Sequence, residues 1–173
     1  MRFALALSLL LLMTVGRADP PASEPRAWSF DSLVQKQSET GSASSTDEQQ
    51  IVALLGRMTE RWNAHDIEGY MEVFWRSPDL CYVCNGQEVM GWGNLMAEYQ
   101  RGFPDRSTMG TVHVDRTLVQ VIHANVASAL DWWSVSFPTK GSHPEFATTT
   151  YLLRKLPAEG WKIVLLHTSF VEP

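Results

Sequence analysis

The chain has 173 residues, of which 45% are hydrophobic, and a formal net charge of -5 at pH 7. This mildly acidic balance, without a Lys/Arg cluster, argues against nucleic acid or an anionic membrane surface as a partner. Beyond about residue 45 the length fits one domain with a core of its own. Seven Trp residues are many for this length and indicate broad apolar surfaces, either a pocket wall or an interface.

The first 18 residues have the pattern of a cleaved export signal. Arg2 precedes an almost wholly apolar run over 3–15, and Ala18 provides a small residue at a cut before Asp19. The run is shorter than the roughly 20 apolar residues that span a bilayer, and no later segment is long and apolar enough to do so. A buried core helix is the alternative, but a polar stretch rich in Pro follows at once. We therefore expect a secreted or periplasmic protein from which residues 1–18 are removed.

Residues 19–45 are rich in Pro and Ser and predict a flexible tether without a core of its own. The tether contains one apolar patch, made of Trp28, Phe30, Leu33 and Val34. This patch either docks onto the domain as a short turn of helix or stays loose, and the sequence leaves both open. The folded domain is expected over 46–173.

The domain begins with helical periodicity and ends in strands. Apolar residues recur at helical spacing in three segments, and Thr46 and Asp66 are placed to cap the first two. Two short extended pieces within 80–91 join at Asn85-Gly86, a strong hairpin signal. The predicted helices cover 46–65, 67–75 and 94–102. The long predicted strands cover 109–122, 126–137, 146–155 and 161–170. Helices followed by antiparallel strands predict an α+β domain with the helices on one face of a sheet.

The two cysteines, Cys81 and Cys84, fall within the first extended piece. Residues three apart in a strand are separated by roughly 10 Å, which is beyond the roughly 7 Å limit for a disulfide. We therefore expect two free thiols, although a disulfide is conceivable in an oxidising compartment. Two ligands are too few for a metal site, so no metal is expected.

Strand alternation sorts the side chains of the last three strands into two faces. The solvent side is marked by Ser128, Ser134, Ser136, Thr148, Thr150, Arg154 and Lys162, so residues of the opposite phase should face inward. The inner face is then expected to present Asp131, Trp133, Thr149, Tyr151 and His167. A bulge in any strand would shift the alternation and exchange its faces.

This inner set has the form of a small-molecule site, with a few polar groups among apolar walls. Burial would raise the pKa of Asp131 and suit it to general acid or base chemistry, with His167 as its partner. These two residues are the candidate catalytic pair. The alternative is that they only satisfy each other structurally. Trp62 and Tyr70 lie on the inner stripes of their helices, where they either pack in the core or line the pocket.

Five short segments occur in an order that resembles a known family. They are RWNAHD at 61–66, YMEVFW at 70–75, SPDL at 77–80, GW at 91–92, and GWKIV at 160–164 with HTS at 167–169. Their order over about 48–171 is similar to the SnoaL-like, ketosteroid-isomerase-homologue branch of the nuclear transport factor two-like superfamily. His167 matches the closing His of the family's last-strand motif. Members often carry a charged or polar residue just before it, whereas this chain has Leu166.

The resemblance implies a cone-shaped fold, in which three N-terminal helices pack on a curved, mainly antiparallel sheet that encloses a pocket. It also implies a homodimer through the outer sheet face, and the outward phase of Leu130 and Trp132 points the same way. Members of the branch include isomerases, cyclases, dehydratases and non-catalytic binding or assembly domains.

Two functions follow from these observations. The first is a pocket that binds a small, largely apolar molecule, with acid/base chemistry of the isomerase or dehydratase type. The second is a non-catalytic accessory or assembly domain that acts through protein–protein contacts of its Trp-rich surface. No cofactor is expected, because the sequence contains no Gly-rich phosphate loop and no cluster of metal ligands.

The export signal gives a first testable prediction. Intact-mass measurement of protein collected after export should show Asp19 as the first residue, because the small residues before it suit a signal peptidase. Retention of Met1 in the exported protein would contradict it.

Overall fold

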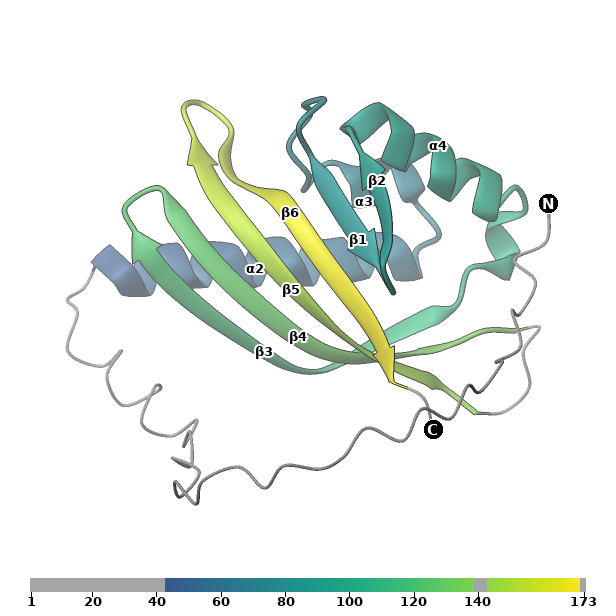
Figure 1. Cartoon of the computed structure of the whole chain (residues 1–173). Coiled ribbons are helices and arrows are strands. Elements are labelled where there is room, and N and C mark those ends of the chain that lie inside the picture. Colours follow the sequence, from purple (N-terminus) through teal and green to yellow (C-terminus); the bar gives the residue numbers. More distant parts are fainter. Residues whose placement is uncertain (1–42, 139–142, 172–173) are drawn as a thin grey trace, which may run out of the picture.

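A computed structural model describes residues 43–138 and 143–171 (Figure 1). The predicted export signal and all but the last three residues of the predicted tether lie outside the described part of the chain. The helices are α2 (Ala43–Asn63), α3 (Ile67–Met71) and α4 (Trp92–Gly102), with a short 3-10 helix, η1 (Arg106–Thr108). Among the described residues, no helix has the length and apolar character needed to cross a membrane.

The helices differ from the predicted ones mainly at their ends. α2 begins at Ala43, so Thr46 lies inside the helix and not at its N-cap. Asp66 caps α3 as predicted, since its carboxylate accepts a hydrogen bond of 2.8 Å from the backbone N–H of Gly69. α3 ends at Met71, four residues earlier than predicted, because the chain beyond it forms a parallel bridge from Phe74 to the last strand.

Six strands form one sheet in the order β2-β1-β6-β5-β4-β3. The strands are β1 (Cys81–Cys84), β2 (Gln87–Met90), β3 (Thr111–His123), β4 (Val126–Ser136), β5 (Glu145–Leu156) and β6 (Gly160–Val171). All neighbours are antiparallel except β1 and β6, which run parallel. The α+β class and the mainly antiparallel sheet are therefore confirmed. The β1–β2 hairpin turns at Asn85-Gly86 with positive φ at both residues, as this dipeptide predicts.

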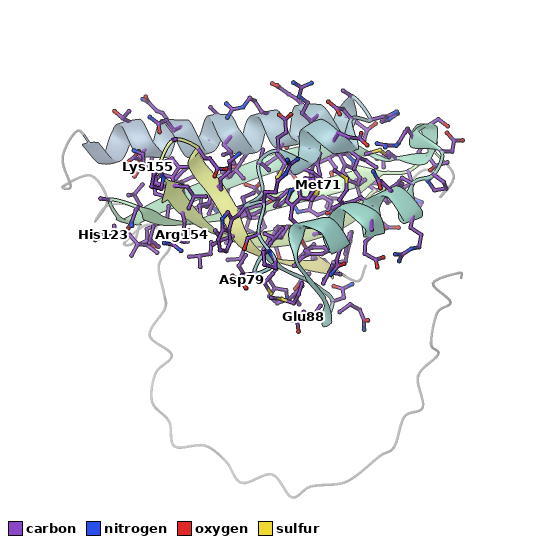
Figure 2. The ribbon with its side chains drawn as sticks, turned by 90° about the horizontal axis from the view of Figure 1, so that it is seen from above. Met71, Asp79, Glu88, His123, Arg154 and Lys155 are labelled. Atoms are coloured by element: carbon purple, nitrogen blue, oxygen red, sulfur yellow. The ribbon has the colours of Figure 1, made fainter. Side chains whose placement is uncertain are left out.

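The helices cover one face of the curved sheet (Figure 1). α2 lies across the longer strands, and α3 and α4 lie beside the β1–β2 hairpin. The buried apolar stripe of α2 consists of Ile51, Leu54, Leu55 and Met58. It belongs to the same core cluster as Ala127, Ala129, Leu153 and Ile163 of the sheet. Seen from above, Met71 lies within the body, whereas Glu88, His123 and Arg154 lie at its outer margins (Figure 2).

An extra residue in β6 changes the direction of its side chains. Leu153 pairs with Ile163, but the neighbouring Leu152 pairs with Leu165, so Val164 has no partner in β5. Ile163 and Val164 are both buried, although they are adjacent. Beyond this bulge the alternation is reversed relative to the pattern expected from Lys162.

The prediction that His167 points inward is therefore wrong. The residues that face inward beyond the bulge are Leu166, Thr168 and Phe170, which line the cavity described below. His167 is exposed on the opposite face, where it is the register partner of Thr150. Cys81 and Cys84 lie on β1 as predicted and are both free thiols.

Candidate functional site

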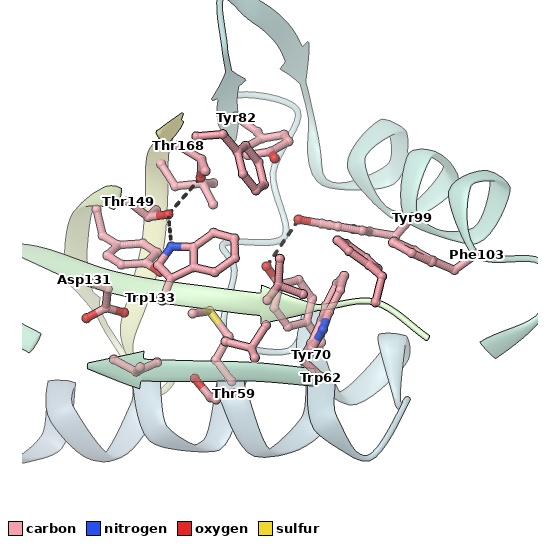
Figure 3. Close-up of a pocket in the computed structure, with 18 residues that line it drawn as sticks. Thr59, Trp62, Tyr70, Tyr82, Tyr99, Phe103, Asp131, Trp133, Thr149 and Thr168 are labelled. Carbon is pink, nitrogen blue, oxygen red and sulfur yellow. Dashed lines mark hydrogen bonds between the residues drawn. The ribbon is translucent and has the colours of Figure 1, made fainter. Parts of the chain in front are cut away.

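A cavity of about 240 Å³ lies between the helices and the sheet (Figure 3). The helices supply Trp62 from the end of α2, Tyr70 from α3 and Tyr99 from α4. The sheet supplies residues of β1, β3, β4, β5 and β6, and most of the wall is apolar or aromatic. Such a cavity has the general form of a small-molecule binding site.

Trp62 is the centre of the aromatic wall. Its ring packs edge-on against Tyr70, Tyr99 and Phe103, with centroid distances of 5.2, 5.9 and 5.4 Å. Its Nε1–H donates a hydrogen bond of 2.8 Å to the backbone carbonyl of Gly110. The indole therefore offers the cavity an apolar ring and no free N–H donor.

Gly110 has to be a glycine for the backbone to lie where the Trp62 indole can reach it. A Cβ at this position would come within 2.5 Å of the Val135 Cγ2 atom. Because Val135 is a buried residue that also lines the cavity, a side chain at residue 110 would force this wall to move.

Among the described residues that line the cavity, Asp131 is the one with a carboxyl group. It lies on β4 with only 2% of its surface exposed, and the Thr117 hydroxyl donates a hydrogen bond of 2.7 Å to its Oδ1. Burial raises the pKa of Asp131, whereas hydrogen bonding from the hydroxyls of Thr117 and Tyr151 opposes the rise. A buried carboxyl with a raised pKa can accept or give a proton nearer to neutral pH than an exposed one.

The tyrosines on the helical side form a hydroxyl pair. Tyr70 and Tyr99 share a hydrogen bond of 3.2 Å between their hydroxyl oxygens (Figure 3). Burial raises the pKa of Tyr70 to about 12 and also raises that of Tyr99. Both hydroxyls therefore stay neutral at physiological pH and keep their protons as hydrogen-bond donors.

The sheet side carries a second polar group. The Trp133 Nε1–H donates a hydrogen bond of 2.9 Å to the Thr149 Oγ1, and that oxygen lies 2.9 Å from the Thr168 Oγ1 (Figure 3). Thr149 and Thr168 are both buried. Tyr151 lies beside them, and burial is the main cause of its raised pKa.

The structure brings most of the predicted site residues together. The lining includes Trp62, Tyr70, Asp131, Trp133, Thr149 and Tyr151. His167 is not among them, so the predicted pair of Asp131 and His167 does not form. The hydrogen-bond partners of Asp131 are instead the hydroxyls of Thr117 on β3 and Tyr151 on β5.

Sequence reasoning also missed several polar residues of the site, namely Tyr82, Tyr99, Thr117 and Thr168. The helical spacing of Leu95 and Tyr99 in α4 is a signal that could have found Tyr99. Thr168 was hidden by the bulge in β6. Thr117 could have been found only from the pairing of β3 with β4, which places it directly opposite Asp131.

Solved structures place this architecture among known folds, although the chain matches no protein-family model and no curated protein sequence. An NTF2-like protein of unknown function from Shewanella oneidensis is 24% identical over 70% of this chain and 98% of its own, with a TM-score of 0.65. An NTF2-like superfamily protein from Salmonella enterica is 23% identical, with coverages of 75% and 94% and a TM-score of 0.63. The chain has the NTF2-like fold.

A third similar structure comes from Novosphingobium aromaticivorans, and aromatic ring hydroxylation has been suggested for that protein. It is 16% identical over 74% of this chain and 91% of its own, with a TM-score of 0.63. Identities this low show a shared fold and do not transfer an activity.

Metal ligands do not converge in the part of the chain that the structure describes. Over 46–138 and 143–171, no three side chains of His, Cys, Asp or Glu lie together in a way that could hold an ion. The chemistry available from the described cavity residues is hydrogen bonding, aromatic packing and proton exchange at Asp131.

Replacing Asp131 with Asn should make stability less dependent on pH. Burial places the folded-state pKa above the ordinary value of 3.8, so the stabilising contribution of the protonated carboxyl is complete below that value. It is lost as the pH rises through the folded-state pKa. The free energy of unfolding of the wild type should therefore fall relative to that of the variant, by about 1.4 kcal/mol for each pH unit by which the pKa is raised.

Urea unfolding of both proteins between about pH 4 and about pH 7 measures this difference, because the other titrating groups are common to the two proteins. A difference that stays constant, or that changes in favour of the wild type as the pH rises, would show that burial does not dominate at Asp131.

Proposed function

We propose that the protein binds a small, largely apolar molecule in this cavity and that Asp131 exchanges a proton with it. One observation carries the proposal: a single buried carboxyl group lies in a cavity whose walls are otherwise aromatic, aliphatic and hydroxyl-bearing. Isomerisation or dehydration fits this arrangement, because each requires proton transfer to or from carbon or oxygen. Assignment to the SnoaL-like, ketosteroid-isomerase-homologue branch belongs to the same proposal.

The walls support an apolar ligand. On the helical side the Trp62 ring contacts those of Tyr70, Tyr99 and Phe103, and Tyr70 and Tyr99 also contact each other. On the sheet side the Trp133 ring packs at 5.6 Å against Phe170. A ligand between these walls would bury its own apolar surface and contact few polar groups, each at a fixed position.

The role of Asp131 rests on its neighbours. Within the described part of the chain, no basic side chain lines the cavity beside the carboxyl. A proton leaving Asp131 must therefore go to the ligand, to water or along a hydroxyl such as that of Tyr151. This arrangement suits one residue that acts in turn as base and acid on the same ligand.

A Phe at residue 114 should close the cavity. Val114 lines it, whereas its neighbour His113 is exposed on the other face of β3. Tetralin, a two-ring hydrocarbon, is a suitable probe, and its binding can be followed by tryptophan fluorescence because Trp62 and Trp133 line the cavity. Val114→Phe should weaken tetralin binding at least about tenfold, because the added ring occupies the site.

His113→Phe is the matched control, since it adds the same side chain outside the cavity and should leave binding unchanged. Equal binding of tetralin by the wild type and Val114→Phe would overturn the proposal. If tetralin binds to the wild type, mass spectrometry of molecules that co-purify with the full protein would identify the natural ligand.

A second function is favoured by the outer face of the sheet. Leu152 and Leu165 are direct register partners there, and each is more than one-third exposed. Phe146 and Val171, also register partners, are more than half exposed. Exposed apolar groups that are adjacent on a sheet face indicate a contact surface, and we propose a second copy of the chain as its occupant. A non-catalytic assembly domain would use the same surface for another protein.

Paired charges on this face should break the dimer. Leu152→Lys with Leu165→Lys places two like charges opposite each other, where an isologous interface would bury them. Light scattering at micromolar concentration should give the mass of a dimer for the wild type and about half of it for the variant. Val52→Lys on α2 is the control, because Val52 is an exposed apolar residue on the helical side of the sheet. A wild type that is monomeric would contradict the proposal.

We also propose that the protein acts outside the cytoplasm, in the periplasm or as a secreted protein. The support is the pattern of its first 18 residues, with a basic start, a short apolar run and small residues before Asp19.

A further inference from the structure

A row of polar side chains crosses the floor of the cavity from strand to strand. The register places Thr117 opposite Asp131, Asp131 opposite Thr149, and Thr149 opposite Thr168. These four residues therefore follow one line perpendicular to β3, β4, β5 and β6, on the face that is covered by the helices. Residues directly opposite on neighbouring strands have Cβ atoms roughly 5 Å apart, so each can contact the next.

The hydrogen atoms of this row do not all have partners within it. Thr149 and Thr168 have one hydrogen each, but the contact between their oxygens uses only one. The Trp133 indole can only donate, and it donates to Thr149. One hydroxyl hydrogen of the pair is therefore left for another acceptor, which is either the Tyr151 hydroxyl beside Thr149 or a group in the cavity beside Thr168.

The indole favours one direction for the pair. A hydroxyl that accepts a hydrogen bond becomes a better donor, so the Trp133 N–H polarises Thr149 toward donating to Thr168. The chain of hydrogen bonds then runs from the Trp133 indole through the Thr149 hydroxyl to the Thr168 hydroxyl. It ends at a side chain that lines the cavity and has 4% of its surface exposed.

We propose that the Thr168 hydroxyl donates a hydrogen bond to an acceptor oxygen of the bound molecule, which makes the ligand an oxygen-bearing ring compound and not a plain hydrocarbon. This inference rests on the proposed function of the cavity. A buried donor without an acceptor is costly, so the site discriminates against a ligand that lacks this oxygen.

The same row gives an approximate length for the ligand. Thr168 and Asp131 are separated by two strand spacings, or roughly 10 Å. A molecule that places its acceptor oxygen at Thr168 and reaches Asp131 with another part must be about the length of two fused rings. Tyr70 and Tyr99 face this space from the helical side.

The test compares two probes with the same ring skeleton, 1-tetralone, which has a carbonyl oxygen, and tetralin, which has none. The full-length protein, Thr168→Val and Thr168→Ser are titrated with each probe by calorimetry. Thr168→Val keeps the shape and removes the hydroxyl, so the preference for 1-tetralone over tetralin should fall by roughly fivefold. Thr168→Ser keeps the hydroxyl and should retain the preference.

Trp133→Phe is a second variant. It removes the indole N–H that donates to Thr149, so the preference for 1-tetralone should fall, but by less than in Thr168→Val. It keeps the inference testable if Thr168→Val does not fold. Thr150→Val is the matched control, because it removes a hydroxyl from the exposed face of β5, and it should leave the preference unchanged. Tyr99→Phe tests the opposite wall of the cavity.

Loss of the preference in Tyr99→Phe, with no change in Thr168→Val and Trp133→Phe, would overturn the inference and assign the acceptor oxygen to the helical side. A wild type that binds both probes with equal affinity would also overturn it while leaving the proposed function standing. A wild type that binds neither probe would overturn both.

Discussion

Val164, the extra residue in β6, determines which side chains of a central strand face the cavity. β6 pairs with β5 on one side and with β1 on the other, so its register is fixed from both edges. The bulge brings Leu166 and Thr168 to the inner face and turns His167 to the outer face. Without it, the imidazole of His167 would lie beside Thr149 in place of the Thr168 hydroxyl.

The covered face of the sheet is divided between packing and binding by the size of its side chains. At one end Ala127, Ala129 and Leu153 belong to the core cluster that includes the apolar stripe of α2. Toward the other end the sheet carries Asp131, Trp133 and Thr149, which line open space. Small residues allow the helix to approach closely, whereas polar groups need either partners or a ligand.

The sequence predicts the fold well where the physical signals are local. Asp66 is a good cap because its carboxylate reaches the N–H of Gly69, and Asn85-Gly86 forms the expected turn because both residues tolerate positive φ. The inward phase of Asp131 and Thr149 was also predictable, since no register shift separates β4 from β5. These features depend on residues close together in the sequence or on simple alternation.

The remaining features depend on contacts between distant segments. The bulge at Val164 has no turn or glycine signal in the sequence, because it arises from the pairing of β6 with β5. The early end of α3 depends likewise on the bridge from Phe74 to Ile163. A prediction from alternation alone therefore placed the inner face of β6 one residue out of phase and made His167 part of the site.

The outward position of His167 also changes the electrostatics of the cavity. The lining residues in the described part of the chain that can titrate are Asp131, Tyr70, Tyr82, Tyr99 and Tyr151. Burial raises the pKa of each tyrosine above its ordinary value of 10, so these hydroxyls stay neutral through the physiological range. Asp131 is then the lining residue whose charge responds to acid. Because low-dielectric walls surround it, any partial charge that a ligand presents to this carboxyl is felt more strongly than it would be in water.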